Sequence, residues 1–411
     1  MKQFFNEFAA NIDTYIMFKI KEKMTNLSEE LSKKGRKPIS LAMGAPTTPP
    51  PALLIEKFKQ AIDTDNIHTY SVPKGEKYLI NSIITRMKKR FGVDVEASEI
   101  CSLLGSKEGI ANLIRGIITP NSDEKQKDII LIPDPSYASY KEMVKVCGGL
   151  GYSVPLTSEN NYMPDMNTFI KQFENDGYDR TKIKALIINY PNNPLGATCT
   201  KEYLEHVVDF CKKNEILLIS DAAYVDIYFD EKYKPHSVLE LTNAKDIAVE
   251  FHSFSKPYSI TGWRIGWVCG NKEVVSQFAK LKSTIDSGIF KGIQLACSEI
   301  INSKEGDDYI TWANKEIKNK SDYFVNTFKN ELGWDFDHIP NATFYHWIKI
   351  PKRYKTSEEF CDDLLTKSGV VMVPGTAFGK YGQGYVRVSI VCSQKELEEV
   401  VKRMKEDGFT Y

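Results

Sequence analysis

Short apolar runs alternate with longer amphipathic stretches between about residues 100 and 270, and this alternation strongly constrains the fold. The apolar runs are rich in Ile, Leu and Val and are bounded by Pro, Asn, Asp or Gly, which is typical of buried strands. Helical patterns such as Tyr203–Lys213 separate them. The runs are Asp128–Pro133, Ile183–Asn189, Ile216–Ser220, Ile247–His252 and Arg264–Cys269. The sequence therefore predicts an α/β domain with a mainly parallel sheet.

The C-terminal part of the chain follows a different pattern. A long polar helical pattern at Asp308–Leu332 precedes strand-like segments at 344–350, 370–374 and 385–390, and an amphipathic helix is expected at Gln394–Lys405. This order is typical of a smaller α+β domain. The segment before about residue 50 has no obvious core of its own and is expected to join it. We predict a large domain at 51–295 and a small domain at 1–50 and 296–411.

Composition and charge narrow the class of protein. The 54 basic and 54 acidic residues cancel, so bulk charge suggests neither a nucleic-acid nor a membrane partner. The eight cysteines are scattered without a C-x-x-C pair, which argues against a metal site and against a disulfide framework. The N-terminal residues lack an uninterrupted apolar signal region, and no window is apolar enough to span a bilayer. We expect a cytoplasmic protein.

Chemically capable side chains follow several of the predicted strands. Because ligands of open α/β sheets bind beyond the carboxyl ends of the strands, one site fed by all of these segments is expected. The residues are Gly105, Ser106, Tyr137, Asn193, Asp221, Ser253, Ser255 and Lys256. Each has a plain structural explanation, for example a surface lysine, a helix cap at Asp221 or a turn at Asn193. For the site to be a coincidence, all of these explanations would have to be true at once, for residues that each follow a predicted strand. We judge that combination improbable.

The residue types in this set suggest a particular cofactor. An enclosed Lys256 amine would lose solvation and become a nucleophile toward an aldehyde. The Gly105-Ser106 turn at a helix start, with Ser253, Ser255 and Arg264 nearby, suits a phosphate. A buried carboxylate needs a cationic partner, and a protonated pyridine nitrogen would serve Asp221. Lysine, aspartate and a phosphate cradle together are what pyridoxal phosphate requires.

Several motifs carry a resemblance to a known family. The segment Ser253–Gly266 (SFSKPYSITGWRIG) matches the signature around the cofactor-binding lysine of class I/II aminotransferases, which are fold-type I pyridoxal-phosphate enzymes. The chain resembles that family from about Leu41 to its end. Supporting motifs are Tyr70–Gly75, Asp134–Tyr140, Asn189–Gly196, Asp221–Tyr224, Pro374–Gly379 and Tyr385–Ile390. The resemblance implies a large domain with a mainly parallel seven-stranded sheet and a smaller α+β domain.

The resemblance also implies roles for individual residues. Lys256 would bind the cofactor as a Schiff base and move the substrate Cα proton, while Asp221 would pair with the pyridinium nitrogen. Asn193 and Tyr224 would bond the phenolic oxygen of the ring, and Tyr137 would stack on its face. The phosphate would be held by Ser106, the backbone of Lys107, Ser253, Ser255 and Arg264.

Other implied roles concern the substrate and a second subunit. Arg387 would bind the substrate α-carboxylate, with Gly44 and Asn193 beside it. Tyr70 would reach the phosphate of the neighbouring subunit, which implies a homodimer with shared active sites. The implied substrates are small amino acids and 2-oxo acids.

The implied reaction is transfer of an amino group between an L-amino acid and a 2-oxo acid. The motifs Gly105–Ile110, Asp286–Phe290 and Pro340–Trp347 resemble a group that includes LL-diaminopimelate aminotransferases, which suggests LL-diaminopimelate with 2-oxoglutarate. Alanine or aspartate aminotransferases and a carbon–sulfur β-lyase of the same fold remain alternatives, because they would share every cofactor residue. A regulator with an aminotransferase-like domain would need a DNA-binding module, for which the roughly forty residues before Leu41 are too few.

Overall fold

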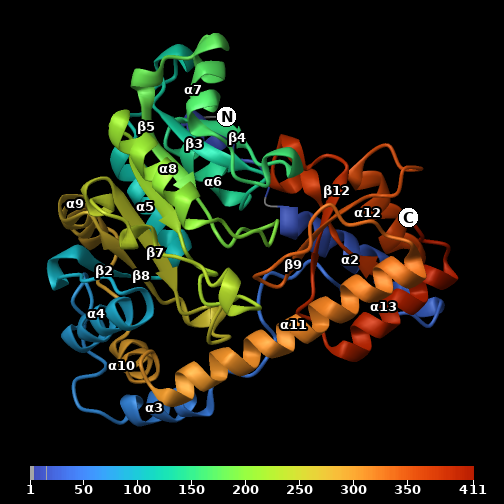
Figure 1. Ribbon diagram of the computed structural model, residues 1–411. Coiled ribbons are helices and arrows are strands. Elements are labelled where there is room, and N and C mark those ends of the chain that lie inside the picture. Colours follow the sequence, from blue (N-terminus) through green and yellow to red (C-terminus); the bar gives the residue numbers. More distant parts are fainter. Residues whose placement is uncertain (1–3, 15) are drawn as a thin grey trace.

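The structure is a computed structural model, and it describes residues 4–14 and 16–411. Figure 1 shows two lobes: a larger one built on a central sheet and a smaller one that contains the C-terminus. Among the described residues, no helix combines the length and the apolar character needed to cross a membrane. The described residues also hold no group of three or more His, Cys, Asp or Glu side chains suited to a metal ion.

The larger lobe contains a seven-stranded sheet in the order β2-β8-β7-β6-β5-β3-β4. Its neighbouring strands are parallel except that β8 is antiparallel to both β2 and β7. The strands are β2 (Ile100–Leu103), β3 (Ile129–Asp134), β4 (Leu150–Pro155), β5 (Ile183–Ile188), β6 (Leu217–Asp221), β7 (Ala248–Ser253) and β8 (Gly266–Gly270). The predicted mainly parallel sheet is confirmed, and five of its strands lie where the apolar runs indicated.

Helices cover both faces of this sheet, as the near-continuous apolar strands require. In β3, Ile129 and Leu131 pack into one cluster with α3, α4, α7, α8 and α10, whereas Ile130 and Ile132 pack into another with α5, α6 and α9. The helices of this lobe are α3 (Ala52–Ile62), α4 (Lys77–Phe91), α5 (Ser106–Ile117), α6 (Ser139–Val146), α7 (Met166–Asn175), α8 (Lys201–Lys213), α9 (Lys272–Ser283) and α10 (Lys291–Ile300). A short helix, α1 (Glu7–Ala10), lies against α6.

The smaller lobe is built around an antiparallel sheet in the order β11-β12-β9 and a parallel pair of β1 with β10. Its strands are β1 (Ile39–Ser40), β9 (Tyr345–Lys349), β10 (Val370–Val371), β11 (Val373–Pro374) and β12 (Tyr385–Ser389). Its helices include α2 (Ile16–Lys33), α12 (Ser357–Ser368) and α13 (Gln394–Glu406). The predicted single strand at 370–374 is divided, because β10 pairs with β1 and β11 pairs with β12.

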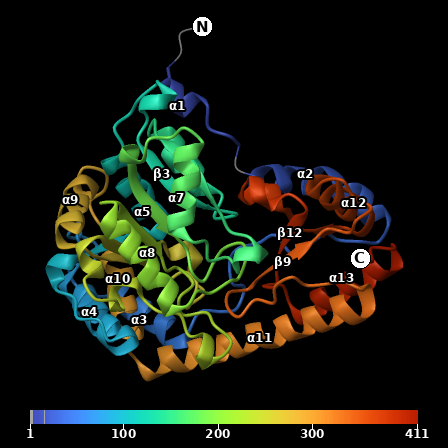
Figure 2. The same ribbon diagram turned by 45° about the horizontal axis from the view of Figure 1, so that its top comes forward.

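The helix α11 (Lys304–Leu332) connects the two lobes, as Figures 1 and 2 show. Its 29 residues correspond to roughly 43 Å of helix. Ser303 caps its N-terminus through the Gly306 amide, and Gly333 ends it with a left-handed φ of 76°. Phe324 and Phe328 pack in the core of the smaller lobe. The helix α11 crosses from one lobe to the other. The domain division at residues 50/51 and 295/296 stays a prediction. The predicted small domain also includes residues 1–3 and 15, which lie outside the described residues.

Candidate active site

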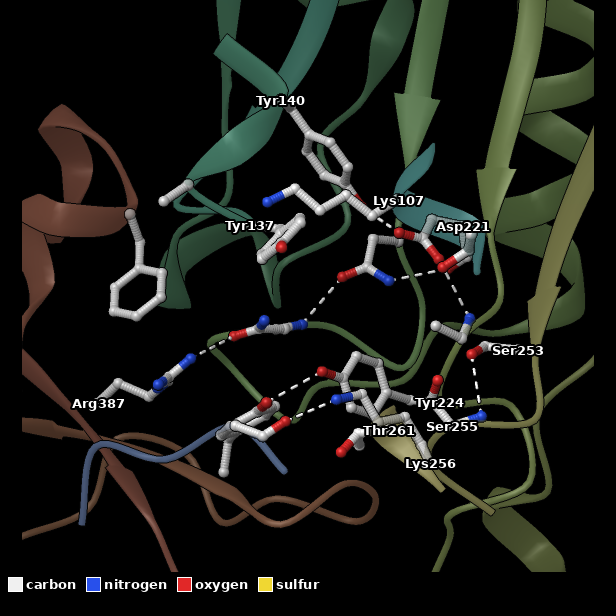
Figure 3. A pocket seen from close by; sticks show the side chains of 18 of the residues that line it. Lys107, Tyr137, Tyr140, Asp221, Tyr224, Ser253, Ser255, Lys256, Thr261 and Arg387 are labelled. Carbon is white, nitrogen blue, oxygen red and sulfur yellow. Dashed lines mark hydrogen bonds between the residues drawn. The ribbon is translucent and has the colours of Figure 1, made fainter. Parts of the chain in front are cut away.

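A pocket of about 280 Å³ opens at the carboxyl ends of the parallel strands, where α/β sheets bind ligands. Figure 3 shows that side chains from both lobes surround it. Twelve of the thirteen site residues expected from the sequence line this pocket: Gly44, Ser106, Lys107, Tyr137, Asn193, Asp221, Tyr224, Ser253, Ser255, Lys256, Arg264 and Arg387. The thirteenth, Tyr70, is absent from the lining and is 87% exposed. The structure therefore brings together residues from segments that are far apart in the sequence.

One wall of the pocket has the features of a phosphate cradle. The 12-residue helix α5 begins at Ser106, and its N-cap Gly105 has a φ of 86°. A Cβ on Gly105 would lie 2.3 Å from Arg264 Nη2, so only glycine leaves room for this guanidinium. Arg264 is held by hydrogen bonds that it donates to the carbonyls of Thr261 (2.7 Å) and Leu104 (3.2 Å). A helix N-terminus beside a fixed guanidinium suits an anion.

A buried hydroxyl in the same wall lacks a partner within the described chain. Ser255 Oγ is buried and makes no hydrogen bond to any described residue, although its backbone N–H donates to Ser253 Oγ at 3.1 Å. A buried polar atom without a partner is costly, so it marks a place where a ligand can supply one. The donor set of this wall, which comprises two serine hydroxyls, a helix start and a guanidinium, fits a phosphate monoester.

Asp221 lies at the end of β6 and is buried. Its Oδ2 accepts a hydrogen bond from the Tyr140 hydroxyl (2.6 Å), and its Oδ1 accepts one from the Ala223 backbone N–H (3.2 Å). Burial raises the pKa of Asp221. The two hydrogen bonds lower this pKa by less, so it stays above the usual value for an aspartate. Such a carboxylate is stabilised by a nearby cation, and a protonated pyridine ring nitrogen fits that requirement.

Lys256 follows β7, and its amine faces the same pocket. Its Nζ donates a hydrogen bond to the Gly44 carbonyl at 2.6 Å. Loss of solvation lowers the pKa of Lys256 to about 8, with a further lowering by the positive charges of Arg264 and Arg387 and an opposing effect of Asp221. Near neutral pH a useful fraction of this amine is therefore unprotonated, which a nucleophilic lysine needs.

A chain of hydrogen bonds connects Asp221 to Arg387. The Asn189 side-chain amide donates to the Asp221 carbonyl (2.8 Å), and Asn189 Oδ1 accepts from the Asn193 backbone N–H (2.9 Å). Asn193 Oδ1 in turn accepts from Arg387 Nη1 at 3.0 Å. This bond uses the acceptor of the Asn193 side chain and leaves its amide N–H groups for other partners. The two ends of the pocket are therefore held in one rigid network.

Arg387 comes from β12 of the smaller lobe and is 5% exposed. Its Nη2 donates to the Ala42 carbonyl at 2.6 Å, whereas its buried Nε finds no acceptor among the described residues. A guanidinium fixed in this way and still short of an acceptor suits a carboxylate ligand.

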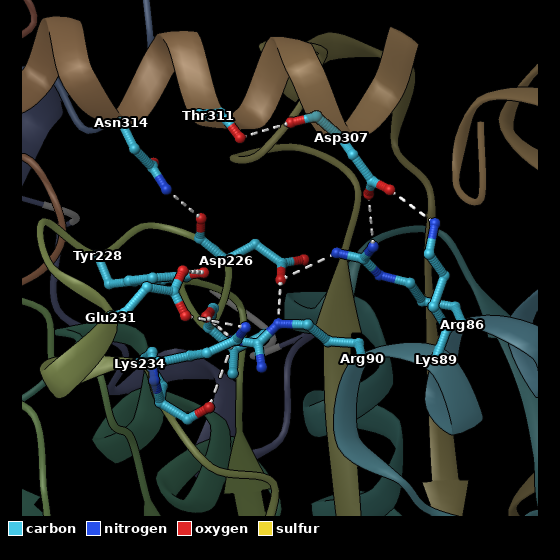
Figure 4. Close-up of polar contacts among 12 residues, drawn as sticks. Arg86, Lys89, Arg90, Asp226, Tyr228, Glu231, Lys234, Asp307, Thr311 and Asn314 are labelled. Carbon is cyan, nitrogen blue, oxygen red and sulfur yellow. Dashed lines mark hydrogen bonds and ion pairs between the residues drawn. The ribbon is translucent and has the colours of Figure 1, made fainter. Parts of the chain in front are cut away.

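A largely buried ionic cluster lies beside the turn that carries Tyr224, and Figure 4 shows its side chains. Asp226 accepts from Arg86 Nη2 (3.0 Å) and from Arg90 Nε (3.1 Å), both on α4. Arg90 also donates to the Val225 carbonyl at 3.2 Å, and Arg86 contacts Asp307 on α11 at 3.2 Å. Burial raises the pKa of Asp226, but the positive charges of Arg86 and Arg90 outweigh that effect and lower this pKa to about 2.

Several lining residues were not singled out from the sequence, although most lie in motifs that were. They are Ile16, Ala42, Ala138, Tyr140, Asn189, Ala223, Thr261, Tyr345 and Phe378. Tyr140 and Asn189 begin or end motifs whose central residues received roles, so the motif itself was the available signal. Tyr345 and Phe378 come from the smaller lobe, and only the packing of that lobe against the sheet brings them to the pocket.

Comparisons with known proteins agree with this geometry. The family described as aminotransferase class I and II matches residues 36–404. An LL-diaminopimelate aminotransferase from Natranaerobius thermophilus is 38% identical over 91% of this chain and 92% of its own length. One from Halothermothrix orenii is 34% identical over 98% of both chains. The substrate-bound structure of BacF from Bacillus subtilis has a TM-score of 0.90 and 29% identity over 98% of both chains.

A more distant likeness bears on the fold alone. A double mutant of the aspartate aminotransferase of Thermus thermophilus has a TM-score of 0.88 at 24% identity, over 99% of this chain and 100% of its own. Taken with the matches above, the chain belongs to the class I and II aminotransferases, and it is a transferase of the pyridoxal-phosphate-dependent kind. These relatives favour amino transfer over the lyase alternative.

The ionic cluster beneath Tyr224 gives a testable prediction. Asp226→Asn leaves Arg86 and Arg90 without their buried countercharge, and we expect a loss of about 3 kcal/mol in the free energy of unfolding. Because the folded pKa of Asp226 is depressed to about 2, its contribution is present above the unfolded pKa near 4 and is lost as the pH falls from about 4 toward 2. Denaturant unfolding of the wild type and the variant at several pH values measures this difference.

A matched control uses Asp307→Asn. This carboxylate contacts the same Arg86, but its side chain is 38% exposed, so solvent screens the pair and the loss should stay below about 1 kcal/mol. Equal losses for the two variants would contradict the role given to the buried cluster.

Proposed function

We propose that this chain transfers amino groups between an L-amino acid and a 2-oxo acid with pyridoxal phosphate bound at Lys256. The observation that carries this proposal is that the Lys256 amine, with its lowered pKa, lines the same pocket as the buried Asp221 and the phosphate cradle. These three features suit the aldehyde, the ring nitrogen and the phosphate of the cofactor.

The residues of the cradle would anchor the phosphate. Ser106 and the Lys107 backbone at the start of α5, Ser253, Ser255 and the Arg264 guanidinium supply the donors. Ser255 Oγ would gain the hydrogen bond that it lacks. Asp221 would accept from the ring nitrogen and keep it protonated, and Tyr137 would cover one ring face. Asn193 and Tyr224 would donate to the phenolic oxygen.

The chemistry supplied by bound pyridoxal phosphate is withdrawal of electrons from the substrate Cα. The chain supplies orientation and proton transfer. Arg387 would bind the α-carboxylate through its unpaired Nε and the fork of its guanidinium, beside Gly44 and Asn193. The Lys256 amine, once it no longer binds the cofactor, would take the Cα proton as a base, for which a pKa near 8 is suitable.

The identity of the substrates is a finer part of the proposal. The names of the relatives above support LL-diaminopimelate as a substrate. We propose that it is the amino donor and that 2-oxoglutarate is the acceptor. Alanine and aspartate are the alternative donors. A carbon–sulfur β-lyase would use the same cofactor residues, so only the products separate it from an aminotransferase. A cytoplasmic location stays a prediction from the sequence.

The proposal is tested by a half-reaction followed by visible absorbance. The protein is loaded with pyridoxal phosphate and mixed, without a 2-oxo acid, with LL-diaminopimelate, glutamate, alanine or aspartate in turn. We expect one donor to convert the bound cofactor stoichiometrically to its amine form, and 2-oxoglutarate to restore the original spectrum. Lys256→Ala should abolish both changes, because the base and the attachment point are lost.

Two other outcomes would contradict the proposal. If the spectrum responds to no donor while cystathionine yields pyruvate and ammonia, the protein is a lyase. If no visible band forms after pyridoxal phosphate is added, the assignment of Lys256 is wrong.

We also propose that two copies form a homodimer with shared active sites. Tyr70 projects from the loop between α3 and α4 and is 87% exposed. Val72, Ile285 and Phe290 are exposed apolar side chains from this loop and from the loop after α9. The two loops are in contact, because a Cβ on Gly288 would lie 2.9 Å from the Val72 carbonyl. An exposed apolar surface that carries a tyrosine supports a subunit interface.

The dimer proposal predicts a specific effect of Tyr70→Phe. This variant should still sediment as a dimer, but its dissociation constant for pyridoxal phosphate should rise about tenfold, because a hydrogen bond to a charged phosphate is lost. Tyr178→Phe is the control, since Tyr178 is also partly exposed but lies outside both the pocket and this interface. A monomeric wild type, or equal affinities in all three proteins, would argue against the shared site.

A further inference from the structure

Tyr345 reaches the pocket from the smaller lobe, and the function proposed above does not use it. It begins β9, is 1% exposed and belongs to the pocket lining. Three groups of the candidate site lie against it: the Tyr224 hydroxyl, the Arg387 guanidinium and the backbone of Gly44. A buried tyrosine hydroxyl normally has a specific partner, so these contacts indicate what Tyr345 does.

The first contact is a hydrogen bond between two tyrosine hydroxyls. Tyr345 Oη lies 2.9 Å from Tyr224 Oη, and the two rings meet edge to face with centroids 5.6 Å apart. Each hydroxyl has a single proton to donate. If Tyr224 donates its proton to the phenolic oxygen of the cofactor, as proposed above, the bond between the two tyrosines must run from Tyr345 to Tyr224. Tyr345 would then direct the proton of Tyr224 toward the cofactor.

The second contact is between the Tyr345 ring and Arg387. The guanidinium carbon lies 4.6 Å from the centre of this ring and 4.7 Å from the centre of the Phe378 ring. Arg387 pairs with Trp347 across β12 and β9, which makes Tyr345 a diagonal neighbour on the same face. Aromatic rings attract a desolvated cation and limit its rotation. The guanidinium plane is therefore set before any carboxylate arrives.

The third contact explains why residue 44 is a glycine. A Cβ on Gly44 would lie 2.8 Å from the Tyr345 hydroxyl, so a larger residue would displace it. The Gly44 carbonyl is also the acceptor for Lys256 Nζ. The hydroxyl of Tyr345 therefore fits between the segment that binds the lysine amine and the turn that carries Tyr224.

We propose that Tyr345 is a positioning residue that links the Tyr224 hydroxyl to the Arg387 guanidinium. Its hydroxyl orients Tyr224, and its ring orients Arg387. This inference rests on the proposed function, since Tyr224 and Arg387 have their roles only with pyridoxal phosphate and a substrate carboxylate. Its consequence is that the smaller lobe helps to prepare the cofactor side of the pocket as well as the carboxylate side.

Two variants separate the hydroxyl from the ring. Tyr345→Phe removes only the hydroxyl. We expect its dissociation constant for pyridoxal phosphate to rise about fivefold, the effect of one typical hydrogen bond. The pH at which the visible spectrum of the bound cofactor changes should shift upward, because Tyr224 would stabilise a negative phenolic oxygen less well. Affinity for maleate, an unreactive carboxylate probe, should change less than about twofold, because the ring is retained.

Tyr345→Leu removes the ring as well. Its dissociation constant for maleate should rise about fivefold or more, since Arg387 loses one of its two aromatic neighbours. Thermal unfolding of each variant without cofactor establishes that it folds. A Tyr345→Phe protein with the wild-type affinity and the wild-type spectral pH dependence would overturn the inference while the proposed function stood. A wild type that binds no pyridoxal phosphate would instead overturn the proposed function itself.

Discussion

The placement of a buried carboxylate and a poorly solvated amine at the ends of adjacent strands is the constraint on which this structure depends. Asp221 ends β6, and Lys256 follows β7, which is parallel to it. Among residues 4–14 and 16–411, neither group has a salt bridge that would compensate for lost solvation. The Tyr140 hydroxyl donates a hydrogen bond to Asp221, and Lys256 donates one to the Gly44 carbonyl. Burial therefore raises the pKa of the carboxylate and lowers that of the amine. A pocket with these properties suits a ligand that brings a positive ring nitrogen and an aldehyde.

Hydrogen bonds in the rest of the pocket fix the position of Asp221 relative to a third group, the Arg387 guanidinium. The amide chain through Asn189 and Asn193 joins Asp221 to Arg387, so the smaller lobe contributes its guanidinium at a fixed place. On the opposite side of the Tyr224 turn, Asp226 binds two arginines of α4. Buried ion pairs contribute little net stability compared with apolar packing. We therefore interpret this cluster as a group of contacts that orients the turn.

Much of the architecture could be predicted because local patterns of apolar and polar residues identify its strands and helices. Apolar strand runs such as Ile129–Asp134 are buried on both faces, so their composition alone identifies them. The strand β4 was not predicted because it is an edge strand that contains Gly151, follows Gly148 and Gly149, and has only one buried residue, Val154. The segment at 370–374 was predicted as one strand, because periodicity does not reveal that its first residues pair with β1 and its last residues pair with β12.

Some site residues could likewise be predicted from local sequence, and others could not. Lys256, Asp221 and Arg264 line the pocket, and the sequence singled them out because each follows or precedes a strand and lies in a recognisable motif. Tyr345 was not assigned a role, because its contacts depend on how the smaller lobe packs against the sheet, which no local pattern encodes. Tyr70 was assigned to the phosphate of a neighbouring subunit; it is exposed in the single chain, and that role stays a prediction.

Attachment of the cofactor to the Lys256 amine can be measured by adding pyridoxal phosphate, reducing the complex with borohydride and mapping the modified peptide by mass spectrometry. We expect one phosphopyridoxyl group per chain, on Lys256, in the wild type. Modification of Lys107 or of surface lysines in its place, or no stoichiometric modification, would contradict it.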